Sequence, residues 1–247
     1  MTVERRVPGL FVTGTDTGVG KTLVAAGLAR FFSRCGLTIG VMKPCETGVA
    51  DVAQPGEDAR LLRWAAGSLD SDELVAPYRL QAPVAPAAAA AQAGMIIEPQ
   101  HISACFDKLS AGKDLLIVEG AGGLMVPLRG GYLMADLVRQ LNVPLLVVVR
   151  PSLGTINHTL LTVFAARAME LPLAGIIINR MPAHPDLAAA EAPHQLASLA
   201  SADLLGVLPE VAGTPEEQIE QLSAVIAGLP TLPWLLKVLG ITLPPRS

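Results

Sequence analysis

Short apolar runs and longer segments with helical spacing of apolar residues alternate along the chain. Helices are predicted at about 21–35, 57–66, 98–111, 134–141, 154–170 and 215–228. The apolar runs have the length and the Val, Ile and Leu content of strands buried on both faces. They are VPGLFVTG (7–14), LTIGVMKP (37–44), DLLIVEG (114–120), VPLLVVVR (143–150), LAGIIINR (173–180) and ADLLGVLP (202–209). The alternation predicts strand-helix-strand units, and therefore an α/β fold in which helices cover both faces of a parallel sheet.

Two segments do not follow this alternation. QAPVAPAAAAAQAG (81–94) has the composition of a linker, but Pro86 followed by five alanines also suits a short helix, which is the favoured interpretation. The apolar segment TLPWLLKVLGITLPPRS (231–247) is expected to dock on the body or on a partner subunit and to carry no chemistry. We therefore predict a single domain over 1–247, with its core at about 8–225.

Composition and charge narrow the functional classes. Of the 247 residues, 51% are hydrophobic and 4% are aromatic, which suits Ala- and Leu-rich helices on a buried sheet. Lys and Arg number 18 against 22 acidic residues, so the net charge of −4 provides no basic field for nucleic acid. Mean hydropathy is +0.48, yet no window reaches the roughly 20 uninterrupted apolar residues that a membrane span needs. With no signal-peptide pattern at the N-terminus, we expect a cytoplasmic protein without nucleic-acid or membrane partners.

Cysteine usage gives little functional information. Cys35, Cys45 and Cys105 form no CxxC pair, so neither a disulfide framework nor a zinc site is predicted. Cys45 alone lies near a candidate site. A reduced thiol in apolar surroundings is the favoured interpretation for all three.

The first strand ends in a loop rich in glycine and hydroxyl residues, FVTGTDTGVGKT (11–22). A loop of this kind between a strand and a helix directs several backbone N–H groups at one point, where an anion can bind. Lys21 can reach outer phosphates, and the Thr22 hydroxyl can ligate Mg²⁺. The pattern G-x-x-x-x-G-K-[ST] is met, except that its first glycine is displaced by one residue, to Gly14. The loop predicts a nucleotide phosphate site formed by Gly18, Gly20, Lys21 and Thr22.

Charged and hydroxyl residues stand at the carboxyl ends of the next predicted strands. These residues are candidate site residues, because ligands of α/β sheets bind beyond the carboxyl ends of the strands. Lys43 closes the second run, and Thr47 follows in the same loop, where its hydroxyl could bind substrate or cap the turn. Glu119 closes the third run, at a place where phosphate-loop proteins hold Mg²⁺ directly or through water. Asp58 begins a predicted helix, and on the residues alone a capping role is favoured for its carboxylate.

The later strand ends offer further polar groups. The stretch GTINH (154–158) precedes a helix whose start could bind an anion such as a carboxylate. The alternative is an ordinary N-cap made by Thr155 or Asn157, with His158 exposed. Asn179 closes the fifth run, and its amide could pair with a purine edge as both donor and acceptor. VLPE (207–210) closes the sixth.

Taken together, these motifs resemble the dethiobiotin synthetase family, over roughly residues 8–225. The resemblance rests on the order and spacing of TGTDTGVGKT, MKPCETG, GEDARLL, VEGAGGLMVPL, GTINHTLLT and IIINR. It implies a P-loop α/β domain that forms a homodimer and makes dethiobiotin from 7,8-diaminononanoate, CO2 and MgATP. In the family mechanism a carbamate attacks the γ-phosphate of ATP, and the second amine then closes the ring. Such chemistry needs cations between two anions rather than a nucleophilic side chain.

The resemblance also implies a role for each matching residue. Lys43 matches the catalytic lysine, which acts with Lys21, and Thr47 matches a substrate-binding hydroxyl. The implied metal set is Thr22, Asp58 and Glu119. The residues that match the binding of the substrate carboxylate, across the dimer interface in the family, are Gly154, Thr155 and Asn157. Besides the metal set, the implied nucleotide-binding residues are Gly18, Val19, Gly20, Lys21, Leu23, Gly120, Ala121, Gly122, Asn179, Arg180, Leu208, Pro209 and Glu210.

The sequence departs from the family pattern at two places, and two other protein families share some of its features. Gly18 replaces a glutamate of some members, and Ala85 and Ala87 stand where Ser and His are common. The amidating domain of cobyrinic acid diamide synthases shares the loop, but those proteins carry a glutaminase domain with Cys and His, and here no cysteine follows Cys105. A dimeric switch ATPase would have an earlier lysine in the loop, which TGTDTGVGKT lacks, and often a basic tail.

Overall fold

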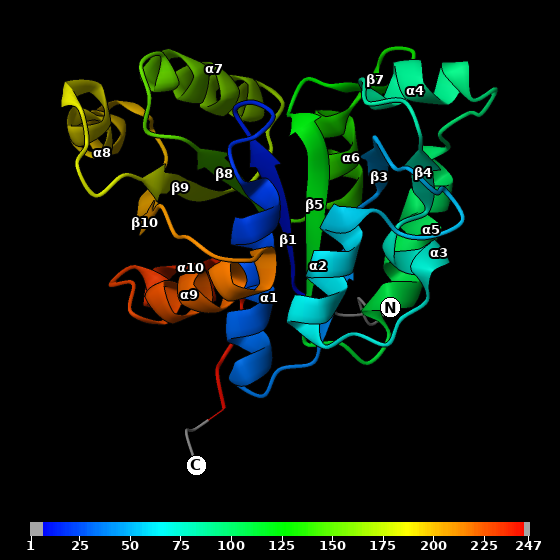
Figure 1. The fold of residues 1–247 in the computed structure, drawn as a ribbon, viewed down its shortest axis with the longest axis horizontal. Helices are drawn as coiled ribbons and strands as arrows, with labels where there is room; N and C mark the ends of the chain where they lie inside the picture. Colours follow the sequence, from blue (N-terminus) through cyan, green and yellow to red (C-terminus); the bar gives the residue numbers. More distant parts are fainter. Residues whose placement is uncertain (1–6, 245–247) are drawn as a thin grey trace.

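A six-stranded parallel sheet forms the centre of the molecule in the computed structural model, which describes residues 7–244 (Figure 1). The strand order is β10-β9-β8-β1-β5-β2, so both neighbours of β1 come from later in the chain. All six apolar runs predicted as strands are strands of this sheet. Their bounds are β1 (Gly9–Gly14), β2 (Ile39–Met42), β5 (Leu115–Gly123), β8 (Leu145–Val149), β9 (Leu173–Met181) and β10 (Leu204–Pro209).

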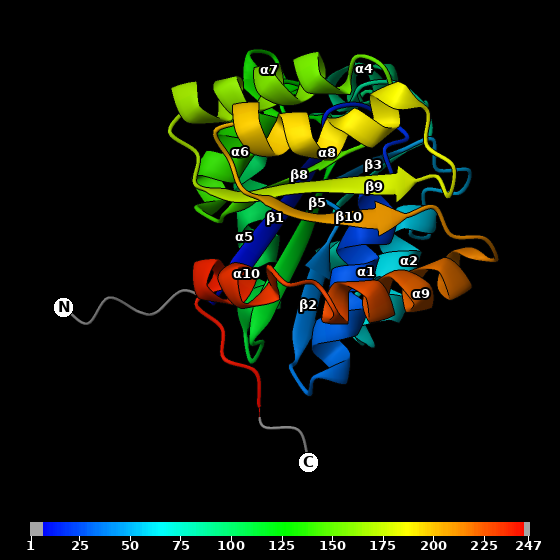
Figure 2. The ribbon, with the colours of Figure 1, turned by 90° about the vertical axis from the view of Figure 1, so that its left-hand side faces the viewer.

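Helices cover both faces of the sheet, as predicted (Figure 2). One face carries α1 (Lys21–Arg34), α2 (Glu57–Ala66) and α9 (Pro215–Ala227), which pack against one another. The other carries α5 (Pro99–Ser110), α6 (Met134–Leu141), α7 (Thr155–Ala168) and α8 (Leu187–Leu199). Strands β1, β5 and β8 are buried along most of their length because both faces are covered. Except for α8, each of these helices was predicted to within two residues at either end.

Smaller elements lie around this core, and the pattern of apolar residues did not predict most of them. They are β3 (Cys45–Thr47) paired with β4 (Tyr78–Leu80), the antiparallel pair β6 (Pro127–Arg129) and β7 (Tyr132–Leu133), and helices α3 (Asp72–Val75), α4 (Pro86–Gln92) and α10 (Leu232–Leu239). The short helix expected after Pro86 is present as α4, so the linker alternative is wrong. The apolar tail segment forms α10, which buries Leu235 and Leu239 against the body.

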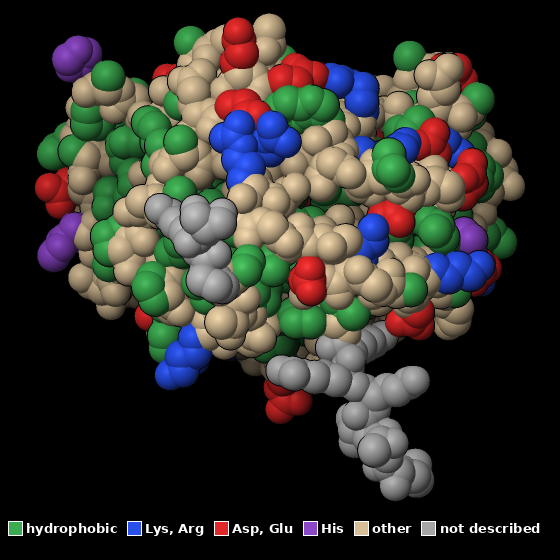
Figure 3. Space-filling view, turned by 90° about the horizontal axis from the view of Figure 1, so that it is seen from below, with side chains coloured by type: hydrophobic (Ala, Val, Ile, Leu, Met, Phe, Trp, Pro, Cys, Tyr) green, Lys and Arg blue, Asp and Glu red, His purple; other side chains and the backbone are tan. Residues whose placement is uncertain are grey.

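The face seen from below, opposite the carboxyl ends of the central strands, shows basic and acidic side chains interspersed rather than gathered by sign (Figure 3). Within residues 7–244 no single helix has the length and apolar composition needed to cross a membrane. Helices α9 and α10 meet that test only as a pair, across a bend of 94°. The charged and hydroxyl residues of the sequence motifs gather at the opposite edge, at the carboxyl ends of the central strands.

Candidate active site

A cavity of about 330 Å³ opens at the carboxyl edge of the sheet, above β1, β2 and β5. It brings together the phosphate loop, the end of β2 with β3, the start of α2, the end of β5 and the end of β9. The residues that line it are Thr17, Gly18, Gly20, Lys21, Thr22, Leu23, Lys43, Cys45, Thr47, Asp58, Glu119, Ala121, Gly122 and Arg180. Five of the sequence motifs, which are far apart in the chain, therefore face one space.

The phosphate loop connects β1 directly to α1, as the sequence predicted. Gly20 is the N-cap of α1 and has a φ of 88°, a left-handed conformation that glycine adopts without strain. A Cβ at this position would lie 2.2 Å from Asn179 Nδ2, so a side chain has no room there. Lys21 is buried, and its ammonium donates to the Asp16 carbonyl at 2.9 Å. Burial lowers the pKa of Lys21 below its ordinary value. The loop thus holds a cation and free helix N–H groups against the cavity.

A second cation, Lys43, also lines the cavity and lies between two carboxylates. The register of the sheet explains this position, because Met42 pairs with Val118 and the next residues, Lys43 and Glu119, lie level with each other. The Lys43 ammonium donates to Glu119 Oε1 at 2.6 Å. It also lies 2.7 Å from Asp58 Oδ2. This brings together three residues that the sequence separates by up to 76 positions.

The ionisation of this cluster follows from burial and from charge. Burial alone would lower the pKa of Lys43, but the Glu119 and Asp58 carboxylates raise it above its ordinary value. Burial raises the pKa of Glu119, and the Lys43 charge opposes that shift. Burial would also raise the pKa of Asp58, yet Lys43 and the Thr22 hydroxyl lower it. Lys43 is therefore a stable ammonium, and Asp58 a stable carboxylate, at neutral pH.

The residues of the expected metal set are close together and suit a hard divalent cation. Thr22 Oγ1 donates to Asp58 Oδ1 at 2.8 Å and lies 3.0 Å from Glu119 Oε1. Glu119 is 1% exposed, and its Oε2 has no hydrogen-bond partner among residues 7–244. Hydroxyl and carboxylate oxygens are the ligands that Mg²⁺ prefers, with phosphate and water completing the shell. The Lys43 ammonium occupies a cation position between the same two carboxylates, so the donor set fits the metal.

The position of Asp58 corrects one interpretation made from the residues alone. Asp58 does not cap α2, whose N-cap is Gly56 without a side-chain hydrogen bond. Its carboxylate points to Thr22 and Lys43 instead. The N–H groups of Gly56 and Asp58 donate to the Glu46 carboxylate of β3, at 3.1 and 2.8 Å. Glu46 was not identified from the sequence, although it stands between Cys45 and Thr47 in MKPCETG.

The end of β9 lies beside the phosphate loop and contributes Arg180 to the cavity lining. Asn179 is buried, its Nδ2 donates to the Val19 carbonyl at 3.1 Å, and its Oδ1 lacks a partner within the described chain. Arg180 has a φ of 62°, a strained conformation for a non-glycine residue, and it donates to the Gly18 carbonyl at 3.2 Å. From the end of β10, Leu208 is buried in the core, whereas Pro209 and Glu210 are exposed. Gly120 is not among the cavity-lining residues, and its carbonyl lies 3.4 Å from Lys43 Nζ.

The stretch before α7 lies outside this cavity. The N-cap of α7 is Gly154, with a φ of 92° and no side-chain cap, so the capping role considered for Thr155 or Asn157 is wrong. Thr155 is buried, and its hydroxyl has no partner within residues 7–244, while Asn157 and His158 are exposed. A neighbouring cavity of about 410 Å³ shares Thr17 and Gly122 with the first one and reaches the middle of α7. Its α7 residues are Leu161, Thr162 and Ala165.

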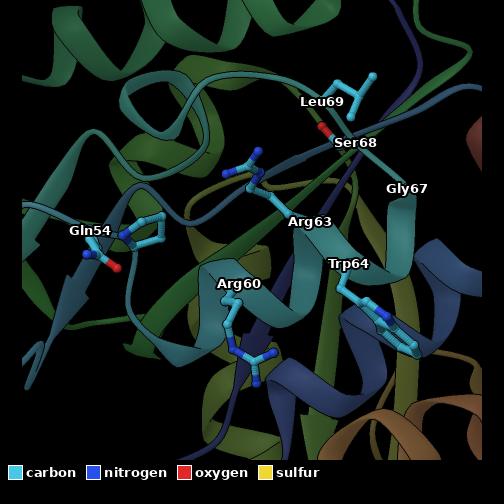
Figure 4. A pocket seen from close by; sticks show the side chains of 8 residues that line it. Gln54, Arg60, Arg63, Trp64, Gly67, Ser68 and Leu69 are labelled. Carbon is cyan, nitrogen blue, oxygen red and sulfur yellow. The ribbon is translucent and has the colours of Figure 1, made fainter.

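A larger surface cavity, of about 490 Å³, lies beside α2 and holds no comparable chemistry (Figure 4). Figure 4 shows Arg63 and Trp64, neighbours in the sequence, on different sides of the helix. The two arginines that line it are already ion-paired, Arg60 with Glu216 at 2.8 Å and Arg63 with Asp72. The candidate active site is therefore the smaller cavity over the phosphate loop.

Comparisons with known proteins show the family and the fold of this chain. A family model described as an AAA domain matches residues 8–218. The ATP-dependent dethiobiotin synthetase BioD of Anaeromyxobacter dehalogenans (strain 2CP-C) is 44% identical over 201 residues, which are 81% of this chain and 89% of that protein. BioD of Bacillus subtilis (strain 168) is 38% identical over 211 residues, 85% of this chain and 91% of the relative.

Solved structures show the same fold at much lower identity. The MinD cell division protein of Aquifex aeolicus has a TM-score of 0.55 at 14% identity and covers 97% of this chain and all of its own. The ParA family ATPase of Chlorobium tepidum TLS has a TM-score of 0.55 at 16% identity, over 95% of this chain and 97% of that one. These two establish the P-loop α/β architecture. The long matches to BioD proteins establish the family: the chain belongs to the dethiobiotin synthetases.

Proposed function

We propose that this protein closes the ureido ring of dethiobiotin from 7,8-diaminononanoate, CO2 and ATP, releasing ADP and phosphate. The observation that carries the proposal is the placement of two buried lysines, Lys21 and Lys43, on one cavity with Thr22, Asp58 and Glu119. Two anions must meet in this reaction, a carbamate and the γ-phosphate. A cavity lined by two ammonium groups lowers the repulsion between these anions.

The reaction is proposed in three steps. One amine of the substrate attacks CO2, loses a proton and becomes a carbamate. A carbamate oxygen then attacks the γ-phosphorus, ADP leaves, and a carbamic-phosphoric anhydride forms. The second amine attacks the carbonyl carbon, phosphate leaves and the ring closes. Lys43 stabilises the negative charge of the carbamate and of the transferring phosphoryl group, and Lys21 holds the outer phosphates. Thr47, on the wall of the cavity beside Lys43, binds the substrate.

The nucleotide would lie along the phosphate loop toward β9. The N–H groups at the start of α1 would hold the phosphates, together with the loop from Gly18 to Leu23. The Oδ1 of Asn179 has no partner among the described residues, which supports an acceptor role toward the adenine amine. Arg180 and the backbone around Pro209 complete this proposed pocket. The cavity-lining residues Ala121 and Gly122, after Gly120, would allow close approach of the phosphates.

Mg²⁺ would be held by Thr22, Asp58 and Glu119. When bound, it supplies positive charge that neutralises the phosphate oxygens of ATP. The Lys43 ammonium bonds the same two carboxylates and would lie beside the metal.

The substrate carboxylate is proposed to bind at the start of α7, from Gly154 to Asn157, of a second copy of the chain. These residues lie outside the cavity of their own chain, and α7 exposes an apolar surface. Leu153, Leu161 and Phe164 are 92%, 58% and 71% exposed, which favours a homodimer interface beside the site. We also propose that the enzyme works in the cytoplasm.

A diamine-dependent assay tests the function directly. Purified protein with MgATP and bicarbonate should release phosphate only when 7,8-diaminononanoate is added, and mass spectrometry should detect the cyclic urea. ATP hydrolysis that is indifferent to the diamine would instead identify a switch ATPase. A requirement for glutamine as nitrogen donor would identify an amidating enzyme.

A further inference from the structure

Glu46 is a buried carboxylate that the proposed reaction does not use. It lies in the middle of β3 and is 5% exposed. Its Oε1 accepts from the Asp58 N–H at 2.8 Å and its Oε2 from the Gly56 N–H at 3.1 Å. The first N–H groups of a helix have no partner within the helix, and here a carboxylate from another strand supplies it. A Cβ on Gly56 would lie 2.3 Å from Glu46 Oε1, so this close approach requires glycine.

This contact connects the two elements that carry the charged cluster. β3 follows Lys43 after one residue, while α2 carries Asp58 in its first turn. Because Glu46 binds the backbone N–H of Asp58, it fixes the position from which the Asp58 side chain extends. That carboxylate reaches Thr22 at 2.8 Å and Lys43 at 2.7 Å. A shift of the helix start would change both distances together.

We propose that Glu46 is a positioning residue that fixes Asp58 for magnesium binding by anchoring the N-terminus of α2. The proposal rests on the proposed function in one respect, the assignment of Asp58 to the metal. Glu46 itself is not among the residues that line the cavity. Its role is to keep Asp58, Thr22 and Lys43 at bonding distance, as residues behind metal ligands do in other metal sites.

The test compares ADP binding with and without Mg²⁺ by calorimetry in Glu46→Gln, which keeps the side-chain volume. The glutamine amide turns an N–H₂ toward one backbone N–H, so one anchoring bond is lost. We expect the gain in ADP affinity caused by Mg²⁺ to fall about 10-fold. The Mg²⁺ concentration for half-maximal turnover should rise by a similar factor, with a smaller change in kcat at saturating Mg²⁺. Glu46→Ala should show the same direction with a larger effect.

Asp186→Ala provides the matched control. Asp186 caps α8 by accepting from the Ala189 N–H at 2.8 Å, and α8 does not line the cavity. The control should lose thermal stability and keep the wild-type response to Mg²⁺. If Glu46→Gln also keeps that response while its Tm falls as in the control, Glu46 is only a helix cap and the proposal is wrong.

The binding measurement separates this proposal from the function itself. It contains no diamine, so wild-type protein that fails the ring-closure assay can still show the expected loss in Glu46→Gln. If Mg²⁺ does not change the ADP affinity of the wild-type protein, the metal assignment of Asp58 is wrong and the positioning role is overturned with it.

Discussion

At the scale of single residues, the two lysines of the cavity have different surroundings, and this difference assigns their tasks. Lys21 belongs to the phosphate loop and bonds a loop carbonyl, that of Asp16. Among the described residues, the Lys43 ammonium bonds groups outside the loop, namely Glu119 and Asp58 by ion pairs and the Gly120 carbonyl at 3.4 Å. Loss of Lys21 should therefore weaken nucleotide binding, and loss of Lys43 should slow the chemical step.

Lys43→Ala should lower kcat by about 10²–10³-fold, because a cation that stabilises transition-state charge is removed. ADP binding should persist, because the phosphate loop is intact. Phosphate release and calorimetry measure the two quantities. Lys21→Ala is the control, and it should lose ADP affinity. Near-normal turnover of Lys43→Ala would contradict the assigned role.

Gly20→Ala should lose nucleotide binding and thermal stability. Two penalties combine: a left-handed φ, which costs about 1–2 kcal/mol for a residue with a Cβ, and a Cβ placed 2.2 Å from Asn179 Nδ2. Gly18→Ala is a matched control, because Gly18 has a φ of 68° but nothing within 4 Å of its added Cβ. Gly18→Ala should therefore show the smaller loss in both thermal melting and ADP titration. Equal effects of the two variants would show that the collision does not matter.

At the scale of elements, short pieces of structure outside the sheet complete the site. β3 has three residues and pairs with β4, whose first residue lies 33 positions later. This pair holds Cys45 and Thr47 on the cavity wall and Glu46 against α2. Helix α7 contributes differently, because its middle borders the neighbouring cavity while its outer side chains remain exposed.

Phe164→Glu should convert the proposed dimer to a monomer, since it puts a charge on the exposed apolar surface of α7. Sedimentation velocity measures the oligomeric state. Leu69→Glu is the control, because Leu69 is 96% exposed in the loop after α2, on a different surface. If Phe164→Glu remains dimeric, or if the wild-type protein is a monomer, α7 is not the interface.

At the scale of the whole molecule, an ion pair connects the start of β5 to a distant segment of the chain. Lys113, before β5, lies 2.8 Å from Asp70, between α2 and α3. Burial alone would raise the pKa of Asp70, but hydrogen bonds from Lys113 and Ser68 and the Lys113 charge lower it. This contribution to stability is thus present above the unfolded-state pKa, about 3.9, and is lost as the pH falls through the lower folded-state pKa.

Asp70→Asn should lower the free energy of unfolding at pH 7 by up to about 1 kcal/mol, because the pair is only partly shielded from water. The difference from wild type should shrink below about pH 4 as the native carboxylate is protonated. Urea denaturation at several pH values measures it. In a double-mutant cycle with Lys113→Met the two losses should be less than additive. A pH-independent difference would show that the ion pair is not its cause.

The amino-acid sequence by itself determined the local structure of this protein. It predicted the strands of the central sheet, most of the large helices and the phosphate loop, because periodicity and glycine placement act within a few residues. It also placed Lys43 and Glu119 at strand ends. The resemblance to a family assigned Asp58 to the metal, where the residues alone favoured a cap.

Only the tertiary structure decided how these pieces meet. The order β10-β9-β8-β1-β5-β2 puts β2 beside β5 and so brings Lys43 to Glu119. The tertiary structure also directs the Asp58 carboxylate to Thr22, while the Glu46 carboxylate accepts from backbone N–H groups at the start of α2. It pairs β3 with β4. Contacts over tens of residues depend on which loops close and which surfaces pack, and a local pattern of polar and apolar residues carries no information about that choice.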